Sequence, residues 1–346
     1  MTRYDPNDLT DWAARALGAS DCDPAIARTT AEVLVEGDLL GHDTHGLFLL
    51  APYLGKLADG GATGRGAPEV ISDRPSAALW DGGMILGPWL TEEAIAAASR
   101  KARETGVGTV AIRRAGHIAC LAAYLEAPAR DGLMVEISSS DPDTASVAPF
   151  GGREAVFTPN PIAVGFPTKA DPVMIDISAS VTTNGMSGRL EKAGERFPHQ
   201  WLLDAEGRPT DDPSVFSRTP KGTIQLLGGM EAGHKGYGLT LTVEAMTGGL
   251  AGYGRADAHE GWGATVTVRL TDPDAFGGLD AFTRQTEWIA GACRAAAPID
   301  PDRPVRLPGE RGLARKRDAL ARGLALNPLV ETAIADVADR MGVPLP

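Results

Sequence analysis

From Pro68 onward the chain alternates between two kinds of segment, and this alternation restricts the fold more than any other feature. Short aliphatic or β-branched runs, typical of buried strands, are interspersed with Ala-rich stretches that are typical of helices. Such a pattern favours an α/β body. The expected strands cover residues 109–112, 133–138, 162–166, 173–177 and 265–270, and the expected helices cover residues 91–103, 119–130 and 280–296.

Both ends of the chain instead have helical patterns. Asp23-Pro24 combines a capping residue with proline at the first helical position, and the helix that follows is expected to end near Gly41. At the other end, helix is expected over residues 309–341, with a break at Asn327-Pro328. We therefore predict a discontinuous helical domain from residues 1–70 and 309–346. Residues 71–308 would form the α/β body, which can divide into two subdomains.

A loose dinucleotide-binding fingerprint, G-x-G-x-x-A, occurs at residues 106–111. In the Rossmann fold this fingerprint must follow a strand and open a helix, because the helix N-terminus then meets the pyrophosphate. Here a predicted helix precedes the glycines and a predicted strand follows them. The sequence therefore argues against a Rossmann fold.

Composition excludes several classes of partner. The net charge is −12, and no basic stripe of the kind used to bind nucleic acid is present. No apolar run is long enough to cross a bilayer, and the N-terminus does not read as a signal peptide. Cys22, Cys120 and Cys293 are widely separated, so we expect no disulfide framework and a cytoplasmic location.

The segment Gly41-His42-Asp43-Thr44-His45-Gly46 places two imidazoles and a carboxylate directly after a predicted helix. One reading is structural, with one histidine at the helix end and the other packed. The other reading makes one histidine a general acid, since imidazole titrates near neutral pH. Residue chemistry alone leaves these readings even. Zinc would need a third ligand and supporting contacts, so we expect no metal.

Three further residues carry candidate chemistry. His117 follows a predicted strand, where sites of α/β folds collect, although a lone histidine there is more often structural. Lys235 lies in a second Gly-rich segment (residues 233–238) and could contact a phosphate or carboxylate, or could be an exposed lysine in a turn. Asp176 ends an apolar run and could cap a turn or orient an imidazole.

Seven segments in this order resemble the type-2 malate/L-lactate dehydrogenase family. They span about 270 residues, so the resemblance is strong although each motif alone is weak. The segments are Gly41 to Gly46, Val147-Ala148-Pro149-Phe150-Gly151-Gly152, Asn160-Pro161-Ile162-Ala163, Asp176-Ile177-Ser178-Ala179-Ser180, Trp201 to Pro213, Gly233 to Leu239, and Pro308-Gly309-Glu310.

The resemblance implies a non-Rossmann nicotinamide-binding fold, NAD(H) or NADP(H) as cofactor, and a homodimer. It implies that His45 is the proton donor beside Thr44, that His117 takes part in proton transfer, and that Asp176 lies near cofactor and substrate. It also implies a set of cofactor-binding positions, which are Ser140, Asn160, Ile177, Ser178, His234, Lys235, Gly236, Gly309 and Glu310.

Departures from the family pattern fall mainly on the substrate side. Leu49 stands where members usually carry an arginine that grips a substrate carboxylate, and Asn184 replaces another arginine. Arg113, Arg114 or Arg189 could supply a cation from elsewhere. We therefore expect a small-molecule 2-oxo or 2-hydroxy acid, or a derivative, other than plain malate or lactate.

Two alternatives remain open. Asp141 stands where the family usually has a small polar residue, and a carboxylate there suits a protonated cyclic imine, which would make the protein an imino acid reductase. The replacement of family arginines on the substrate side is also compatible with a homologue that binds the cofactor without catalysing a reaction. Retention of the histidines, Asp176 and Lys235 favours an enzyme.

Overall fold

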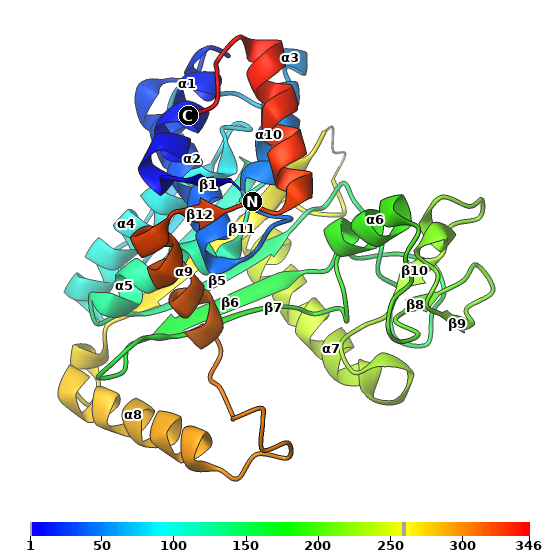
Figure 1. The fold of residues 1–346 in the computed structure, drawn as a ribbon. Coiled ribbons are helices and arrows are strands. Elements are labelled where there is room, and N and C mark those ends of the chain that lie inside the picture. Colours follow the sequence, from blue (N-terminus) through cyan, green and yellow to red (C-terminus); the bar gives the residue numbers. More distant parts are fainter. Residues whose placement is uncertain (1, 258–260) are drawn as a thin grey trace. The chain divides into compact units, whose positions relative to one another are not determined.

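The computed structural model describes residues 2–257 and 261–346 (Figure 1). Within these residues, seven strands form one sheet in the order β2-β3-β4-β11-β5-β6-β7. The strands are β2 (Glu69–Asp73), β3 (Ala77–Asp81), β4 (Val107–Gly116), β5 (Met134–Ser140), β6 (Pro161–Phe166), β7 (Val173–Ser178) and β11 (Gly263–Thr271).

The parallel pair β3 and β4 is joined by the long helix α4 (Gly87–Thr105). Parallel neighbours need such a crossover, because a tight turn cannot reverse the chain twice. The helix ends at Gly106, whose φ of 88° is left-handed, and β4 begins at once. The G-x-G-x-x-A segment thus follows a helix and opens a strand, which confirms that it is no Rossmann fingerprint.

The chain divides into two compact units, which are described separately. Unit 1 comprises Met1–Ile137, Ala163–Asp176 and Val268–Pro346, and unit 2 comprises Ser138–Ile162 and Ile177–Thr267. No helix among the described residues combines the length and apolar character that a membrane crossing demands.

Unit 1 joins helices from both chain ends (Figure 1). Trp12, fully buried on α1, donates its indole N–H to the carbonyl of Val343 at 2.9 Å, and β1 pairs antiparallel with β12. The elements are β1 (Arg3–Tyr4), α1 (Pro6–Gly18), α2 (Pro24–Leu40), η1 (Leu47–Leu49), α3 (Leu50–Asp59), η2 (Leu121–Tyr124), α5 (Glu126–Arg130), η5 (Pro273–Ala275), α8 (Leu279–Ala295), α9 (Glu310–Arg322), β12 (Leu324–Ala325) and α10 (Pro328–Met341).

Unit 2 has its own core around Val147, Phe157 and Leu202. A small sheet in the described part of this unit has the order β10-β8-β9. The elements are α6 (Asn184–Ala193), β8 (Leu202–Leu203), β9 (Pro209–Thr210), η3 (Pro213–Phe216), β10 (Thr223–Ile224), α7 (Gly229–Glu244) and η4 (Ala245–Gly249).

The mixed α/β class and the helical chain ends are as predicted. The single helix expected over residues 119–130 is instead a short 3-10 turn, η2, followed by α5. Ala119 has a φ of 57°, which no α-helix tolerates, so the helix cannot start there. The break expected at Asn327-Pro328 is present, because Asn327 caps α10 and Pro328 opens it.

Candidate active site

The segment that carries His42 and His45 is a tight loop after α2. The helix ends at Gly41 with a left-handed φ of 88°, and the His42 N–H then donates to the Gly37 carbonyl at 2.8 Å. The buried carboxylate of Asp38 accepts the N–H of Leu47 at 2.7 Å. The loop is therefore held at both ends, and the two histidines do not share a helical face.

His45 faces His117 within unit 1. The two rings are stacked, with centroids 5.9 Å apart and planes inclined by 28°. Nδ1 of His45 lies 2.9 Å from the hydroxyl of Thr44. Tyr53 places its hydroxyl 3.0 Å from Nδ1 of His117 and donates to the His117 carbonyl at 2.8 Å. The structure thus brings together three of the predicted site residues, Thr44, His45 and His117, and adds Tyr53.

Both imidazoles are neutral at physiological pH. Burial, with a smaller effect of nearby His42, lowers the pKa of His45 to about 4. Burial, and then His45, lowers the pKa of His117 to about 3. The Ala119 N–H donates to Nδ1 of His117 at 3.2 Å, so this atom is the acceptor and the neutral ring carries its proton on Nε2.

Asp176 lies beside His42 and Cys120. Its carboxylate accepts the Ala122 N–H at 2.9 Å and lies 3.9 Å from the Cys120 thiol. Burial raises the pKa of Asp176, and His42 opposes this shift. Asp176, which the resemblance places near cofactor and substrate, thus lies in unit 1 beside the imidazole of His42.

Two of the three arginines that could bind the substrate carboxylate have another partner. Leu49 is buried on η1 and offers an apolar surface. Arg113 and Arg114 both pair with the buried carboxylate of Asp81, at 2.8 and 2.7 Å. Arg189 lies on α6 in unit 2. Both arginines of β4 therefore form ion pairs with Asp81, which leaves them poorly placed to bind a substrate carboxylate.

Polar side chains of unit 2 meet at the carboxylate of Glu244. Ser140 and Asn160 both donate to its Oε1 at 2.9 Å, and Arg255 pairs with it at 2.8 Å. Arg255 also donates to the Asp141 carbonyl at 3.1 Å. The predicted positions Ser140, Asn160 and Asp141 are thus fixed by two residues that the sequence analysis did not select.

The carboxylate of Asp141 is satisfied locally. It accepts the Thr144 hydroxyl at 2.8 Å and the Asp143 N–H at 3.1 Å. Burial is the largest influence on this group and raises its pKa. The Asp141 side chain therefore stabilises the turn formed by residues 141–144.

The second Gly-rich segment lies inside helix α7, so the reading of Lys235 as a turn residue is wrong. A side-chain carbon at Gly236 would lie 2.6 Å from the backbone of Leu227, so this glycine permits close packing of the helix. His234 and Lys235 are exposed on α7, and the His234 ring lies edge-on to Phe150 at 5.8 Å.

The remaining predicted cofactor positions fall in both units. Ile177 is 42% exposed, and the Ser178 hydroxyl donates to the Ser180 carbonyl at 2.8 Å. Gly309 precedes α9 with a φ of 91° and has no room for a side chain beside Met174. Glu310 pairs with Arg294 at 2.6 Å.

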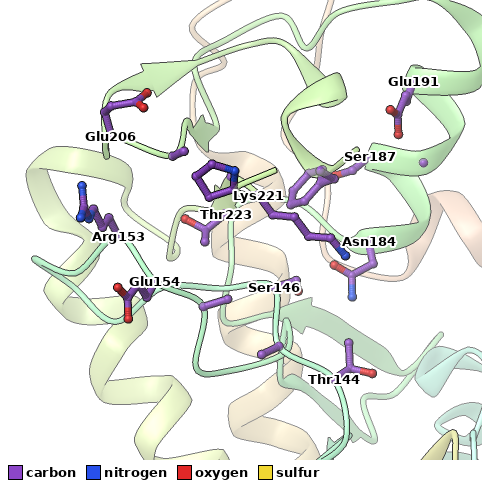
Figure 2. Close-up of a pocket in the computed structure, with 17 residues that line it drawn as sticks. Thr144, Ser146, Arg153, Glu154, Asn184, Ser187, Glu191, Glu206, Lys221 and Thr223 are labelled. Atoms are coloured by element: carbon purple, nitrogen blue, oxygen red, sulfur yellow. The ribbon is translucent and has the colours of Figure 1, made fainter. Parts of the chain in front are cut away.

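A cavity of about 560 Å³ lies within unit 2 (Figure 2). Figure 2 shows Lys221 extending toward Asn184, the residue that stands in place of a family arginine. The charges of the lining are mixed, with Arg153 and Lys221 against Glu154, Glu191 and Glu206. This cavity is lined by none of the residues predicted as catalytic.

Tyr53, Glu244 and Arg255 are the site-forming residues that sequence reasoning missed. Their partners lie between 11 and 115 positions away, so no local motif contains them. One signal for Glu244 is its position as the one charged residue of Leu239 to Leu250, because a carboxylate in such a stretch needs a partner.

Comparison with known proteins identifies the family. The sequence profile of the malate/L-lactate dehydrogenase family matches residues 4–335. Hydroxycarboxylate dehydrogenase B of Escherichia coli O157:H7 is 29% identical over 350 residues, covering 99% of this chain and 95% of the relative.

Solved structures agree with this match. A dehydrogenase from Sinorhizobium meliloti is 31% identical with a TM-score of 0.85, covering 97% of this chain and 98% of the other. A malate dehydrogenase from Entamoeba histolytica, 22% identical, shares the fold with a TM-score of 0.93 over 100% of this chain and 99% of the other. The chain therefore belongs to the malate/L-lactate dehydrogenase family and is an NAD(P)-dependent oxidoreductase.

Proposed function

We propose that the protein interconverts a 2-hydroxy acid, or a derivative of one, with the corresponding 2-oxo compound. The observation that carries this proposal is the pair of half-buried, neutral imidazoles of His45 and His117, with ring centroids 5.9 Å apart, in a chain of this family. The name of the hydroxycarboxylate dehydrogenase relative supports the substrate class.

His45 is the proposed proton-transfer group. With a pKa of about 4, its ring is unprotonated at neutral pH and can accept the proton of a substrate hydroxyl as hydride leaves the adjacent carbon. In the reverse direction the same ring returns the proton to oxygen. Nε2 of His117 carries a hydrogen and can donate to the substrate oxygen, which would hold the reacting group beside the two rings.

The predicted cofactor residues fit a nicotinamide dinucleotide. The nicotinamide ring accepts or supplies the hydride when it is bound. Lys235 is exposed and makes no ion pair within the described residues, so its ammonium is available for a phosphate. Gly309 is needed for the close packing of the start of α9 against Met174, so its role toward the cofactor rests on the family resemblance alone.

The proposed substrate differs from plain malate or lactate. Leu49 cannot donate a hydrogen bond, and Arg113 and Arg114 are paired with Asp81. A charge-assisted contact of the kind lost here is worth about 1.5–3 kcal/mol. We infer a substrate that is less charged or more apolar where it meets Leu49, such as an amide, ester or longer-chain 2-oxo acid.

The test is oxidation of NADH and NADPH against 2-oxo acids, their amides and esters, and cyclic imines. We expect turnover of a 2-oxo compound, with apolar or uncharged members exceeding oxaloacetate and pyruvate. Cofactor binding by calorimetry without turnover of any member would contradict the proposal and favour the non-catalytic alternative.

Turnover of the imine members alone would establish the alternative of a cyclic imino acid reductase. In that case Asp141→Asn should abolish the activity, because the carboxylate would stabilise the iminium. The engagement of Asp141 by Thr144 makes this the second choice. The same assays decide between NAD and NADP, and sedimentation tests the homodimer that the family resemblance implies.

A further inference from the structure

Three potential metal ligands from distant segments converge inside unit 1. They are His42 in the loop after α2, Cys120 after β4, and Asp176 on β7. One ligand atom of each lies within 4.8 Å of the other two. The sequence shows no third ligand for the two histidines, whereas the fold brings Cys120 and Asp176 beside His42 from distant segments.

The spacing is close to that of a tetrahedral site. Zinc binds thiolate at about 2.3 Å and imidazole or carboxylate at about 2.0–2.2 Å, which places the ligand atoms about 3.3–3.6 Å from one another. The Cys120 sulfur and the Asp176 oxygen are already 3.9 Å apart. His42 is half-buried, so a rotation of its ring can complete the approach.

Supporting contacts hold two of the ligands in place. The Ala122 N–H binds Asp176 at 2.9 Å, and such outer contacts orient metal-binding carboxylates. The backbone of His42 is fixed at both ends, because its N–H donates to Gly37 and its carbonyl accepts the His45 N–H at 2.8 Å. Cys120 is buried, while Asp176 and His42 retain some exposure through which an ion can enter.

We propose that His42, Cys120 and Asp176 form a binding site for a zinc-like divalent cation. The donor set of sulfur, nitrogen and oxygen selects a borderline ion such as Zn²⁺ over Mg²⁺ or Ca²⁺, which prefer oxygen alone. Three protein ligands leave the fourth position to a water molecule or another small ligand.

Binding exchanges a proton for the ion. The Cys120 thiol loses its proton to the buffer as the sulfur–metal bond forms, and the charge on the ion is partly balanced by the thiolate and Asp176. Metal binding is thereby coupled to the release of one proton.

The experiment adds Co²⁺, and then Zn²⁺, to the full-length protein without cofactor or substrate. We expect one ion per chain and a thiolate-to-cobalt charge-transfer absorption in the near ultraviolet, which Zn²⁺ displaces. Cys120→Ser should remove this absorption, and His42→Gln should weaken binding by more than the roughly 10- to 100-fold that loss of an outer contact costs.

Cys293→Ser is the matched control, because this half-buried thiol lies on α8 outside the cluster, and it should leave the spectrum unchanged. Circular dichroism checks that each variant folds. If Cys120→Ser does not fold, His42→Gln decides the question alone. The proposal is overturned if the wild-type protein shows no thiolate–cobalt absorption, if the absorption survives Cys120→Ser, or if His42→Gln binds Co²⁺ as tightly as the wild-type protein.

Discussion

The rings of His45 and His117 lie nearly parallel, with centroids 5.9 Å apart, and neither carries a charge at neutral pH. Replacement of His45 by Gln removes the proposed proton-transfer group. We expect turnover to fall by about 10²–10⁴-fold while cofactor affinity changes little. Steady-state kinetics and calorimetric cofactor titration measure the two effects. The exposed His199 is the control, and His199→Gln should keep full turnover.

The depressed pKa of His45 sets the acid limit of substrate oxidation. The unprotonated ring is the active form, so lowering the pH inactivates it only near pH 4, whereas an ordinary histidine titrates near pH 6.5. We expect kcat/KM for oxidation to be nearly constant between pH 7 and 5.5. A histidine with an ordinary pKa would have lost about nine-tenths of its active form at pH 5.5. An acid limb centred between pH 6 and 7 would contradict the assignment.

Restoring the family arginine tests the role of Leu49. The Leu49→Arg variant should gain a charge-assisted contact worth about 1.5–3 kcal/mol with a dicarboxylate substrate, and therefore about 10- to 100-fold in kcat/KM for oxaloacetate. Leu49→Met keeps the volume without the charge and should show no gain. A folded Leu49→Arg protein with unchanged preference would show that position 49 does not face the substrate.

Asp38 makes the stability of unit 1 depend on pH. Burial, with a contribution from Asp43, raises the pKa of Asp38 to about 8, against about 3.8 in the unfolded chain. The folded state therefore holds the proton more tightly, and this contribution to stability is lost as the pH rises from 3.8 to 8. Asp38→Asn mimics the protonated acid, so it should stabilise the protein increasingly over this range, by up to about 1.4 kcal/mol per pH unit.

Urea unfolding at pH 5 and pH 7.5 measures this effect. Asp318→Asn, on the exposed face of α9, is the matched control and should shift the two midpoints equally. An equal effect of Asp38→Asn at both pH values would mean that Asp38 is charged in the folded protein.

The ion pair of Glu244 and Arg255 should contribute strongly to the stability of unit 2. Both side chains are less than one-fifth exposed, so Glu244→Gln would leave the guanidinium buried without an anion. We expect a loss of about 3 kcal/mol in stability and faster hydrogen exchange around Ser140 and Asn160. Arg208→Ala breaks an exposed pair with Asp204 and should cost at most about 1 kcal/mol. Similar losses of stability in Glu244→Gln and Arg208→Ala would contradict a special contribution of the buried ion pair.

The fold class could be predicted because its signals are local. The helix before residue 106 and the strand over residues 107–116 are both indicated by their hydrophobic periodicity and by the glycines between them. Because the helix comes first and the strand second, the segment does not have the order that a Rossmann fold requires. The start of the helix after His117 was harder to predict. Ala119 adopts a left-handed φ in the turn that aims His117 at Tyr53, and a tertiary contact of this kind overrides the helix propensity of alanine.

The composition of the site was predictable only in part. His45 could be predicted from the segment Gly41 to Gly46, and His117 could be predicted from the family resemblance. It does not reveal that His42 turns away toward Cys120 and Asp176, since those residues are 78 and 134 positions further along the chain (120 − 42 and 176 − 42). Hydrogen-bond partners from separate elements decide such geometry, and they are fixed only when the elements pack.

The hydrogen bond from Trp12 to Val343 joins residues 331 positions apart. During synthesis, the indole N–H of Trp12 has no access to the Val343 carbonyl until α10 and the residues after it have left the ribosome. Unit 1 therefore matures last, although its first two helices emerge first. A nascent chain that stops before α10 leaves the apolar surface around α1 uncovered, which marks it for recognition by chaperones and proteases.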